Sequence, residues 1–472
     1  MNFGINKCAT MVVRPNIPFF QNKKDPTFYL AGQPLPTTDC YTYLGVPFDK
    51  NLSLNPIVKV INNKLRKSLY SVSNFLKNPK IPLPFKKIII NSYIISKVSY
   101  FSPLLGSNKV RSNSAQKVVN KALRWAAGVH KAKSFTSVYS ISKDFNIPPL
   151  SAKCALAQVK CFNKWKNSNC IISNLVNNIP KTRKHTWTKE SKILKGKLEK
   201  RGDTTQAIKN FYWNRDLKQK SIKAKFYDDN KFEETSDFMK LCYEYPNLSY
   251  GFNWLLRARS GYKLDARVAK AAKFIIPVCP NYCPCCRKEI QTINHWLISC
   301  PSFNTIRQKV QDKISFVFNY LNHSHNNSNN VHNNDHSNNS VTDTTIGNNS
   351  VNESFNDISN VSVHGNNVYN NSSVSDKVFK FLLGGRNFNN NTREWKELIK
   401  CQLKSGIYSD SPFLVVTAAL FQSIMPIAIG QQWSLFNRFK STSLTTKSVN
   451  ADNTVGQTSR VSATNEDHNF TT

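Results

Sequence analysis

The chain has 472 residues, and its 65 Lys and Arg residues outnumber its 28 Asp and Glu residues, which gives a formal net charge of +37. This charge exceeds what solubility requires and favours a polyanionic partner, with RNA or DNA first and an anionic membrane second. Twelve cysteines are too few for a disulfide-stabilised scaffold, and the first residues (MNFGINKCATMVV) contain no secretory signal. We therefore expect an intracellular protein of about two to four domains, in the nucleus or the cytoplasm. The alternative is a basic composition that serves no binding function.

Residues 1–50 predict a small antiparallel β-piece. Short apolar runs such as ATMVV and TFYLAG alternate with turn residues, and five prolines within residues 15–36 exclude helix. Only about three strands fit, which is marginal for an independent sheet. We expect this segment to be the edge of a larger domain.

Residues 51–175 predict a basic helical bundle. Ile57, Ile61, Leu65 and Leu69 recur at helical spacing, with lysines and arginines on the other faces. Prolines at 79, 82 and 84 end this helix. Further helices are expected over 85–105, 114–129 and 151–165.

The segment that follows is more polar and predicts a helical connector over 176–250, with helices near 204–227 and 235–243. A helix over 251–274 then opens a region that extends to residue 320. The mainly α fold class rests on these helical patterns.

A metal site is predicted in this region, in the run CPCCRKEIQTINHWLISC. Cys283, Cys286, His295 and Cys300 have the spacing C-x2-C-x8-H-x4-C. Three sulfurs and one imidazole complete a tetrahedral set for a structural zinc and leave no position for a catalytic water. Cys279 and Cys285 are spare thiols that can replace a ligand, and a cluster of reduced cysteines near a histidine is the alternative.

The composition changes abruptly beyond residue 320. Residues 321–376 are rich in Asn and Ser with few large apolar residues, and they predict a disordered linker. A helical region is expected over 377–440, and a disordered polar tail over 441–472. Residues 412–430 (PFLVVTAALFQSIMPIAIG) carry no charge and approach the length of a membrane span, but Gln422 and Pro426 interrupt them. A buried core helix is the favoured interpretation, and a membrane segment is the alternative.

Several short motifs occur in a fixed order along the chain. They are residues 4–11 (GINKCATM), 30–32 (LAG), 43–46 (YLGV), 147–150 (IPPL) and 255–261 (LLRARSG), followed by the cysteine and histidine set. Each motif alone is weakly specific, but in this order they resemble the C-terminal half of a reverse transcriptase of non-LTR retrotransposons. The resemblance covers about residues 1–310 and implies a palm end over 1–50, a thumb-like bundle over 51–175 and the family's zinc-binding region over 251–320.

The polymerase carboxylates are expected to be absent. Polymerisation needs two metal ions held by paired carboxylates, and in the family their Tyr/Phe-x-Asp-Asp hairpin precedes the motif that here begins at residue 4. A literal match at 226–229 (FYDD) follows the thumb-like bundle and is flanked by Lys225 and Asn230, so we interpret it as a solvated helix end. Lys7 resembles a palm lysine, and without the metals it receives no catalytic role. We therefore predict that the chain is not an enzyme.

Candidate nucleic-acid contacts lie on two basic segments, where cations can bind phosphates without reading sequence. For any single lysine, a solvated helix face is the alternative. Trp213, beside Tyr212 and Arg215, can stack on bases or belong to the core. The candidates are Lys64, Arg66, Lys67, Lys117, Lys121 and Arg124 in the bundle, and Arg257, Arg259, Lys263 and Arg267 beside the zinc set.

These observations lead to three hypotheses about function. The first is a non-catalytic RNA- or DNA-binding remnant of a retrotransposon polymerase with a structural zinc. The second is the thumb and zinc part of a split or truncated polymerase, which would work with an upstream polymerase segment. The third is a protein- or membrane-interaction role for residues 412–430. A relic that is not made as protein is a further possibility.

Overall fold

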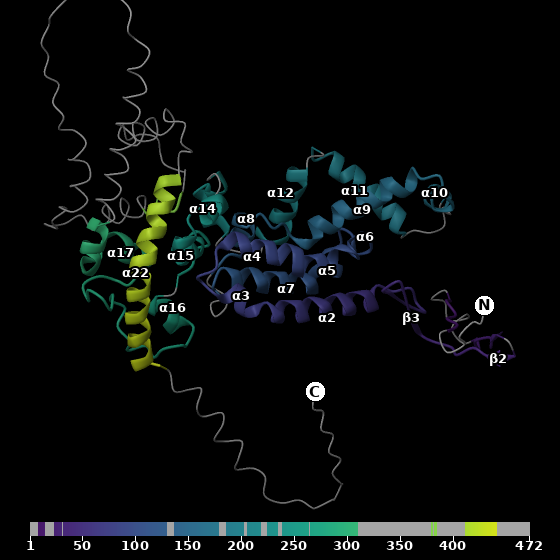
Figure 1. Cartoon of the computed structure of the whole chain (residues 1–472), viewed down its shortest axis with the longest axis horizontal. Coiled ribbons are helices and arrows are strands. Elements are labelled where there is room, and N and C mark those ends of the chain that lie inside the picture. The colour runs from purple at the N-terminus through teal and green to yellow at the C-terminus, as the bar shows by residue number, and fades with distance from the viewer. Residues whose placement is uncertain are drawn as a thin grey trace, which may run out of the picture.

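The computed structural model describes most of the chain up to residue 309 and one long helix near the C-terminus (Figure 1). The described part is mainly helical, as predicted, with two small antiparallel sheets. The predicted linker over 321–376, the tail over 441–472 and most of 377–410 lie outside the described residues. Those described are 8–14, 23–30, 32–129, 136–178, 186–202, 205–218, 224–234, 238–263, 265–309, 379–380, 382–384 and 411–440.

The predicted β-piece consists of two separate hairpins rather than about three strands. In the second hairpin, Tyr43 pairs with Val46 across a two-residue turn. Leu44 and Gly45 form that turn with φ angles of 48° and 78°, as a tight hairpin requires. Leu44 is 76% exposed at the tip. The strands are β1 (Tyr29–Leu30) with β2 (Gln33–Pro34) and β3 (Cys40–Tyr43) with β4 (Val46–Asp49).

The centre of the bundle is a pair of long helices, α2 (Asn55–Ser71) and α7 (Lys109–Ala126), which pack side by side. The apolar residues predicted for α2 are all buried, and the side chain of Asn108 caps α7 by accepting a hydrogen bond from the Val110 N–H. The remaining helices of this region are α3 (Ser73–Lys77), α8 (Val138–Asp144), α9 (Leu150–Lys166), α10 (Ile171–Asn177) and α11 (Trp187–Glu199).

The helix predicted over 85–105 is confirmed up to Ser99, although it contains a π-turn, and it is interrupted by a turn at residues 100 and 101. The hydroxyl groups of Ser92, Ser99 and Ser102 donate hydrogen bonds to the carbonyls four residues earlier. Such bonds compete with the helix backbone and bend it. The segments are α4 (Leu83–Ile89), the π-helix η2 (Ile90–Ile95), α5 (Ser96–Ser99) and α6 (Ser102–Leu105).

Two other predicted helices are also divided. The helix expected over 251–274 forms α15 (Ser249–Arg259) and α16 (Ala266–Ala271). Gly261, with a φ of 72°, follows the end of α15, and Asp265 caps α16 by accepting from the Val268 N–H. The helix expected over 204–227 forms α12 (Thr205–Asp216) and α13 (Ala224–Asp229), and α14 (Phe238–Glu244) follows.

The uncharged segment near the C-terminus forms α22 (Ser411–Arg438), which packs against α15 (Figure 1). The two backbones approach so closely that a Cβ on Gly251 would lie 1.9 Å from the carbonyl oxygen of Ala418. The Gln422 side chain accepts from the Gly251 N–H at 3.0 Å and donates to the Asn247 carbonyl at 2.8 Å. Both contacts fix α22 on α15.

The solvent face of α22 is mostly polar, with Ser423, Gly430, Gln431 and Asn437 exposed. Among the described residues, Leu414–Arg438 is the helix with the length and hydropathy of a membrane span, and 44% of its apolar window is buried inside the protein. Its buried apolar face and polar outer face favour the interpretation as a core helix.

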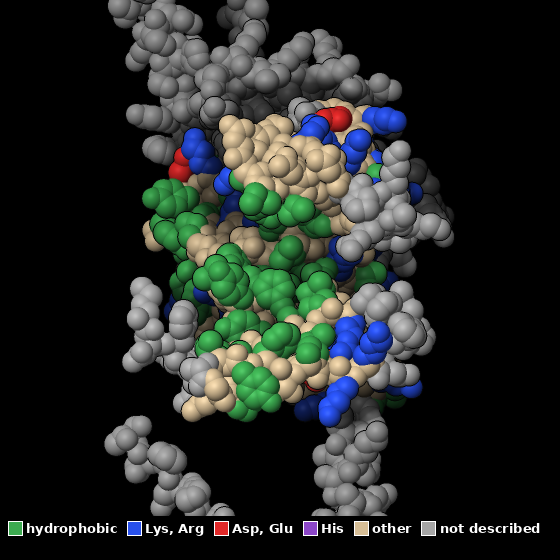
Figure 2. All heavy atoms as spheres, turned by 90° about the vertical axis from the view of Figure 1, so that its right-hand side faces the viewer, with side chains coloured by type: hydrophobic (Ala, Val, Ile, Leu, Met, Phe, Trp, Pro, Cys, Tyr) green, Lys and Arg blue, Asp and Glu red, His purple; other side chains and the backbone are tan. Residues whose placement is uncertain are grey.

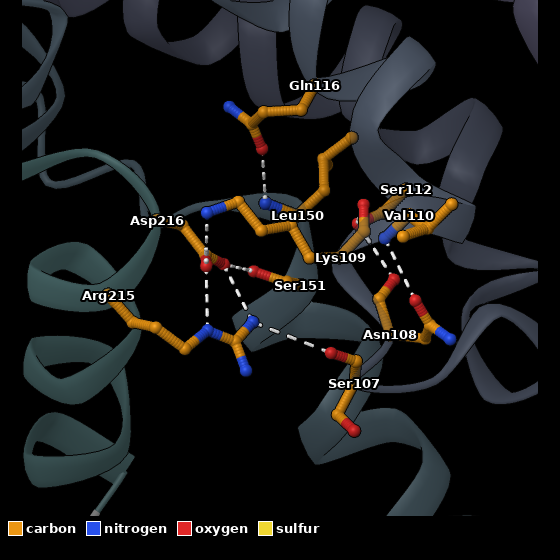
Figure 3. A network of polar contacts seen from close by, with 10 residues as sticks. All are labelled: Ser107, Asn108, Lys109, Val110, Ser112, Gln116, Leu150, Ser151, Arg215 and Asp216. Carbon is orange, nitrogen blue, oxygen red and sulfur yellow. Dashed lines mark hydrogen bonds and ion pairs between the residues drawn. The ribbon is translucent and has the colours of Figure 1, made fainter. Parts of the chain in front are cut away.

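A polar network joins the ends of α7, α9 and α12 (Figure 3). The carboxylate of Asp216 is buried and accepts hydrogen bonds from the Arg215 guanidinium at 2.7 and 2.9 Å and from the Ser151 hydroxyl. Lys109 lies 3.5 Å from the same carboxylate, and Gln116 accepts from the Leu150 N–H at 2.7 Å. Burial raises the pKa of Asp216, but the bonds from Arg215 and Ser151 outweigh it and hold the pKa below the ordinary 3.8.

Replacing this carboxylate should destabilise the protein at neutral pH. Asp216→Asn leaves Arg215 and Lys109 without their counter-charge, and we expect the free energy of unfolding to fall by about 1–3 kcal/mol. Because the folded-state pKa is lowered, the stabilisation is complete above pH 3.8 and is lost as the pH falls below it. Denaturant unfolding of both proteins at several pH values measures this difference.

Glu199→Gln is the control, because Glu199 forms an exposed pair with Lys195 one turn away. This substitution should cost only about 0.3–0.5 kcal/mol. An equal loss for both variants would show that the Asp216 network contributes no more than a surface pair.

Candidate functional site

A tight loop presents the first two cysteines of the metal motif. Tyr282 and Ile290 form an antiparallel bridge, and inside it the Cys283 N–H donates to the Glu289 carbonyl at 2.7 Å. The Arg287 N–H donates back to the Cys283 carbonyl at 2.8 Å. These bonds turn the chain so that Cys283 and Cys286 face the same point.

The short helix α17 (Ile293–Ile298) carries the histidine. The hydroxyl oxygen of Thr292 caps it and accepts from the His295 N–H at 2.9 Å. After α17 the Cys300 N–H donates to the His295 carbonyl at 2.7 Å, which folds the chain back on the helix. His295 and Cys300 therefore face the loop.

The four ligand atoms lie within 4.8 Å of one another. The sulfurs of Cys283 and Cys300 are 3.9 Å apart, and the Cys286 sulfur is 3.2 Å from Nε2 of His295. A tetrahedral zinc with bonds of about 2.3 Å separates its sulfurs by roughly 3.8 Å. The predicted set thus forms a group that can hold a metal ion, and its dimensions are compatible with zinc.

The spare cysteines do not belong to this group. Cys279 is buried in a separate apolar cluster with Ala266, Ala269 and Phe436. Cys285 follows Cys283 in the loop but is not one of the four clustered ligands. None of the described cysteines forms a disulfide, and Cys40 and Cys170 are exposed.

Side chains that the sequence motif does not reveal support the ligands. Nδ1 of His295 lies 2.8 Å from the Glu289 carboxylate and 3.0 Å from the Ser299 hydroxyl, so Nε2 is directed to the sulfurs. The indole N–H of Trp296 donates to the Cys283 sulfur at 3.2 Å. A carboxylate behind a ligating histidine is the usual second layer of a zinc site.

The ligands also perturb each other's protonation. Burial alone would lower the pKa of His295, but hydrogen bonds with the sulfurs of Cys283 and Cys286 raise it to about 9. Burial raises the pKa of Cys300 to about 12. Zinc requires a neutral imidazole and thiolates, so its binding releases these protons and its affinity should increase with pH.

Four protein ligands leave no position for a catalytic water, which is the arrangement of a structural zinc. The surrounding core is continuous with the rest of the protein, because Cys283, Trp296 and Cys300 belong to the same apolar cluster as α15 and α22. A metal ion bound by these four ligands would hold the segment after α16 against the main body.

The predicted basic stripe beside the metal site is wrong for Arg259 and Arg257. Arg259 is only 1% exposed, and its guanidinium forms a bidentate ion pair with Asp144 at 2.8 and 3.1 Å. It also donates to the carbonyls of Phe232 and Leu383. The pair satisfies the buried charge, which keeps Arg259 in the core and away from any phosphate.

Arg257 instead caps the C-terminal end of α7, together with Lys86. Arg257 donates to the Ala127 carbonyl at 2.8 Å, and the buried Lys86 ammonium donates to the Ala126 carbonyl at 3.0 Å. Cations at this end of a helix are stabilised by its unpaired carbonyls. Burial, with the nearby Arg257 charge, lowers the pKa of Lys86 to about 7. Of the predicted stripe, Lys263 and Arg267 remain exposed.

The predicted contacts in the bundle are mostly accessible. Lys64, Arg66, Lys67 and Lys117 are exposed and Lys121 is half-buried, whereas Arg124 has its Nε buried. The core interpretation holds for Trp213, which is 1% exposed and donates to the Ser142 hydroxyl at 2.7 Å. Tyr212 is likewise buried, and Arg215 pairs with Asp216.

Tyr70 and Lys77, which the sequence analysis missed, join Arg66, Lys121 and Trp125 in a cluster that we call the Tyr70 cluster. Lys121 donates to the Tyr70 hydroxyl at 2.9 Å and lies 5.0 Å from the Trp125 ring centre, while Lys77 lies 4.5 Å from it. The bond and charge of Lys121, with Arg66 and Lys77, lower the pKa of Tyr70. Helical spacing places Tyr70 one turn after Arg66, which is the signal that reveals it.

Acidic residues are excluded from this part of the chain. Between Asp49 and Asp144 the sequence contains no Asp or Glu, and Asp144 itself forms a buried ion pair with Arg259. The cations of α2 and α3 therefore have no acidic residue on their own helices, whereas Lys109 and Arg111 at the start of α7 pair with Asp216 and Glu190.

The FYDD match is part of the core packing. Tyr227 is 1% exposed and donates to Asp144 at 2.7 Å, and Asp228 accepts from Tyr139 at 2.9 Å. The motif does end α13, but the predicted solvated environment is wrong for Tyr227. Only Asp229 of the two carboxylates is fully exposed.

No protein-family model matches the chain, and no curated protein or solved structure is significantly similar to it.

Loss of one ligand should abolish stoichiometric zinc binding. We expect the purified protein to contain one zinc ion, and Cys286→Ser and Cys300→Ser to lose it. Glu289→Gln removes the partner of His295 and should weaken zinc binding about tenfold. Metal analysis and competition with a chelator measure both effects.

Cys285→Ser and Cys279→Ser are the matched controls, because they remove thiols outside the group. Both should retain zinc. Zinc removal should raise hydrogen exchange between residues 279 and 303 before it affects α2 and α7. Loss of zinc in the Cys285 variant, or retention in the Cys300 variant, would overturn the assignment.

Proposed function

We propose that the chain binds single-stranded RNA or DNA without polymerising it, and that a structural zinc holds its C-terminal module together. The observation that carries this proposal is the Tyr70 cluster within an acid-free stretch. Its lysines and arginine attract phosphates, and Tyr70, 58% exposed, offers an aromatic face on which a base can stack.

The accessible cations of α2 and α7 extend this surface. Lys67 and Lys117 are exposed on the two helices that flank the cluster. Such contacts neutralise phosphates and carry no sequence information, so we expect tight binding at low salt with little sequence preference.

The resemblance to a non-LTR retrotransposon reverse transcriptase supports the same function. It would make the bundle thumb-like and the zinc loop the family's zinc-binding region. In the FYDD match, Tyr227 and Asp228 form hydrogen bonds with residues of α8 and do not lie on a strand hairpin. A remnant that binds nucleic acid is therefore the function we favour.

The binding test uses fluorescence anisotropy with single-stranded RNA and DNA over a series of salt concentrations. Each of Lys77→Gln and Lys121→Gln should reduce the slope of log affinity against log salt by about 0.7, and Tyr70→Leu should weaken binding about tenfold without changing the slope.

Lys189→Gln and Lys192→Gln on α11 are the controls, since both lysines are exposed and α11 lies away from α2 and α3 (Figure 1). They should change affinity less than the cluster variants. Absence of binding at low salt, a salt-independent affinity, or equal effects of both pairs would contradict the proposal.

A second candidate is the thumb and zinc part of a split polymerase. The end of the protein that carries the N-terminal hairpins displays an apolar surface (Figure 2), where large side chains such as Tyr29, Tyr43 and Tyr100 are more than half exposed. Exposed apolar surface of this kind marks a protein contact. Isolated two-stranded hairpins also gain stability from further strands.

Primer extension distinguishes the two candidates. The chain alone should not extend a primer, and a palm segment with an intact Tyr/Phe-x-Asp-Asp motif should restore extension if the split-polymerase candidate is correct. Leu44→Ser, at the hairpin tip, should then weaken the association. No extension and no association with such a segment would exclude this candidate.

A further inference from the structure

The short helix α10 displays its apolar side chains to solvent. Ile171 and Leu175, one turn apart, are 77% and 68% exposed, and Ile172 is exposed beside them. No residue of α10 is buried. A single exposed aliphatic side chain is ordinary, but three neighbouring ones on one helix form a patch of the kind that marks a contact surface.

The polar side of α10 faces the protein instead. The Ser173 hydroxyl and the Asn177 amide both donate to the Lys166 carbonyl at the end of α9, at 2.9 and 3.3 Å. Ser173 and Asn177 share one face of the helix, and the rotation of about 100° per residue places Ile171 and Leu175 on roughly the opposite face. These hydrogen bonds therefore hold the polar face of α10 inward and its apolar face outward.

The patch lies at one end of the molecule. Figure 1 shows α10 beyond α9 and α11, at the end opposite to α17 and α22. Its packing partner is α9. An apolar patch at the end of an elongated molecule can contact a flat surface without hindrance from the body of the protein.

The surroundings of the patch are basic. Lys164 and Lys166, in the last turn of α9, are exposed, and none of the described residues forms an ion pair with either of them. The sequence contains no Asp or Glu between Asp144 and Glu190, and Glu190 itself is engaged in an ion pair. Positive charge therefore adjoins the aliphatic patch without an acidic residue close in sequence to oppose it.

This combination of aliphatic side chains and cations selects the kind of partner. Nucleic acid would satisfy the lysines but offers no hydrocarbon in which aliphatic side chains can be buried. A second copy of the chain would bring the same positive charge to the contact. An anionic lipid bilayer offers acyl chains to the aliphatic side chains and headgroup charge to the lysines.

We propose that this surface, which we call the α10 tip, docks on a membrane that contains anionic lipids. The aliphatic side chains enter the boundary between headgroups and acyl chains, and the lysines lie at the headgroup phosphates. So small an insertion gives reversible binding and leaves α22 in the core. Docking needs neither the Tyr70 cluster nor the metal site. The α10 tip consists of Lys164, Lys166, Ile171, Ile172 and Leu175.

The test is co-sedimentation of the full chain, freed of nucleic acid, with vesicles of phosphatidylcholine with and without phosphatidylserine. The wild-type protein should bind the anionic vesicles. Ile171→Ser with Leu175→Ser should bind them at least about tenfold more weakly, because less apolar area leaves water. No binding by the wild type, or unchanged binding by this variant, would overturn the proposal.

A gain of binding excludes loss of folding as the cause. Leu175→Trp should strengthen binding to anionic vesicles about threefold, because tryptophan favours the membrane interface. The matched control is Val110→Ser with Val278→Ser, which removes exposed aliphatic side chains elsewhere. It should leave the affinity within about twofold, and a loss equal to that of the α10 variant would contradict the assignment.

The electrostatic part has its own pair of variants. Lys164→Gln with Lys166→Gln should weaken binding to anionic vesicles at least about tenfold. Lys59→Gln with Lys273→Gln removes the same charge from exposed positions on other elements and should have a smaller effect. Equal losses for the two pairs would reduce the effect to net charge and contradict a site at α10.

Two further measurements test the other occupants. Sedimentation velocity should show a monomer, and a dimer that Leu175→Ser dissociates would assign the surface to a second copy and overturn the proposal. The variant with serine at 171 and 175 should bind single-stranded RNA as the wild type does. A parallel loss of RNA binding would assign the α10 tip to nucleic acid and would likewise overturn it.

Discussion

The buried ion pair of Arg259 and Asp144 is the contact on which the arrangement of the helices depends. Its guanidinium donates hydrogen bonds to Asp144 of α8 and to the carbonyls of Phe232 and Leu383, and Tyr227 of α13 donates to the same carboxylate. Three aromatic rings surround the cation. A buried pair of this kind adds little net stability over an apolar replacement, but each partner requires the other. It therefore fixes which segments meet rather than how strongly they hold.

The same constraint explains the distribution of charge over the surface. Asp144 is the single carboxylate in a long basic stretch, and it is paired with Arg259. Lys86 and Arg257 donate hydrogen bonds to carbonyls at the C-terminal end of α7. Among the described residues, the cations of the Tyr70 cluster form no ion pair, whereas Lys109 and Arg111 of α7 pair with Asp216 and Glu190. The unpaired cations of this stretch therefore lie beside the exposed ring of Tyr70.

Sequence patterns were sufficient where the determining interactions are local. The candidate metal ligands were found because a loop and one helical turn hold all four within eighteen residues, and α2 and α7 because their apolar spacing is regular. The helix over 85–105 was predicted as one element because its apolar pattern does not reveal the π-turn at Ile90–Ile95 or the new helix start at Pro103. Arg259 was placed on the surface because its partner lies 115 residues earlier in the chain.

The contact of α22 with α15 also has a consequence for how the protein is made. The face of α15 that receives α22 leaves the ribosome more than one hundred and fifty residues before its partner. At ordinary rates of translation the apolar face waits for roughly ten to thirty seconds. During that interval the face of α15 around Gly251, which α22 covers in the folded protein, is accessible to other chains and to chaperones. Contacts of such long range also slow folding after release, because the intervening chain must first be closed into a loop.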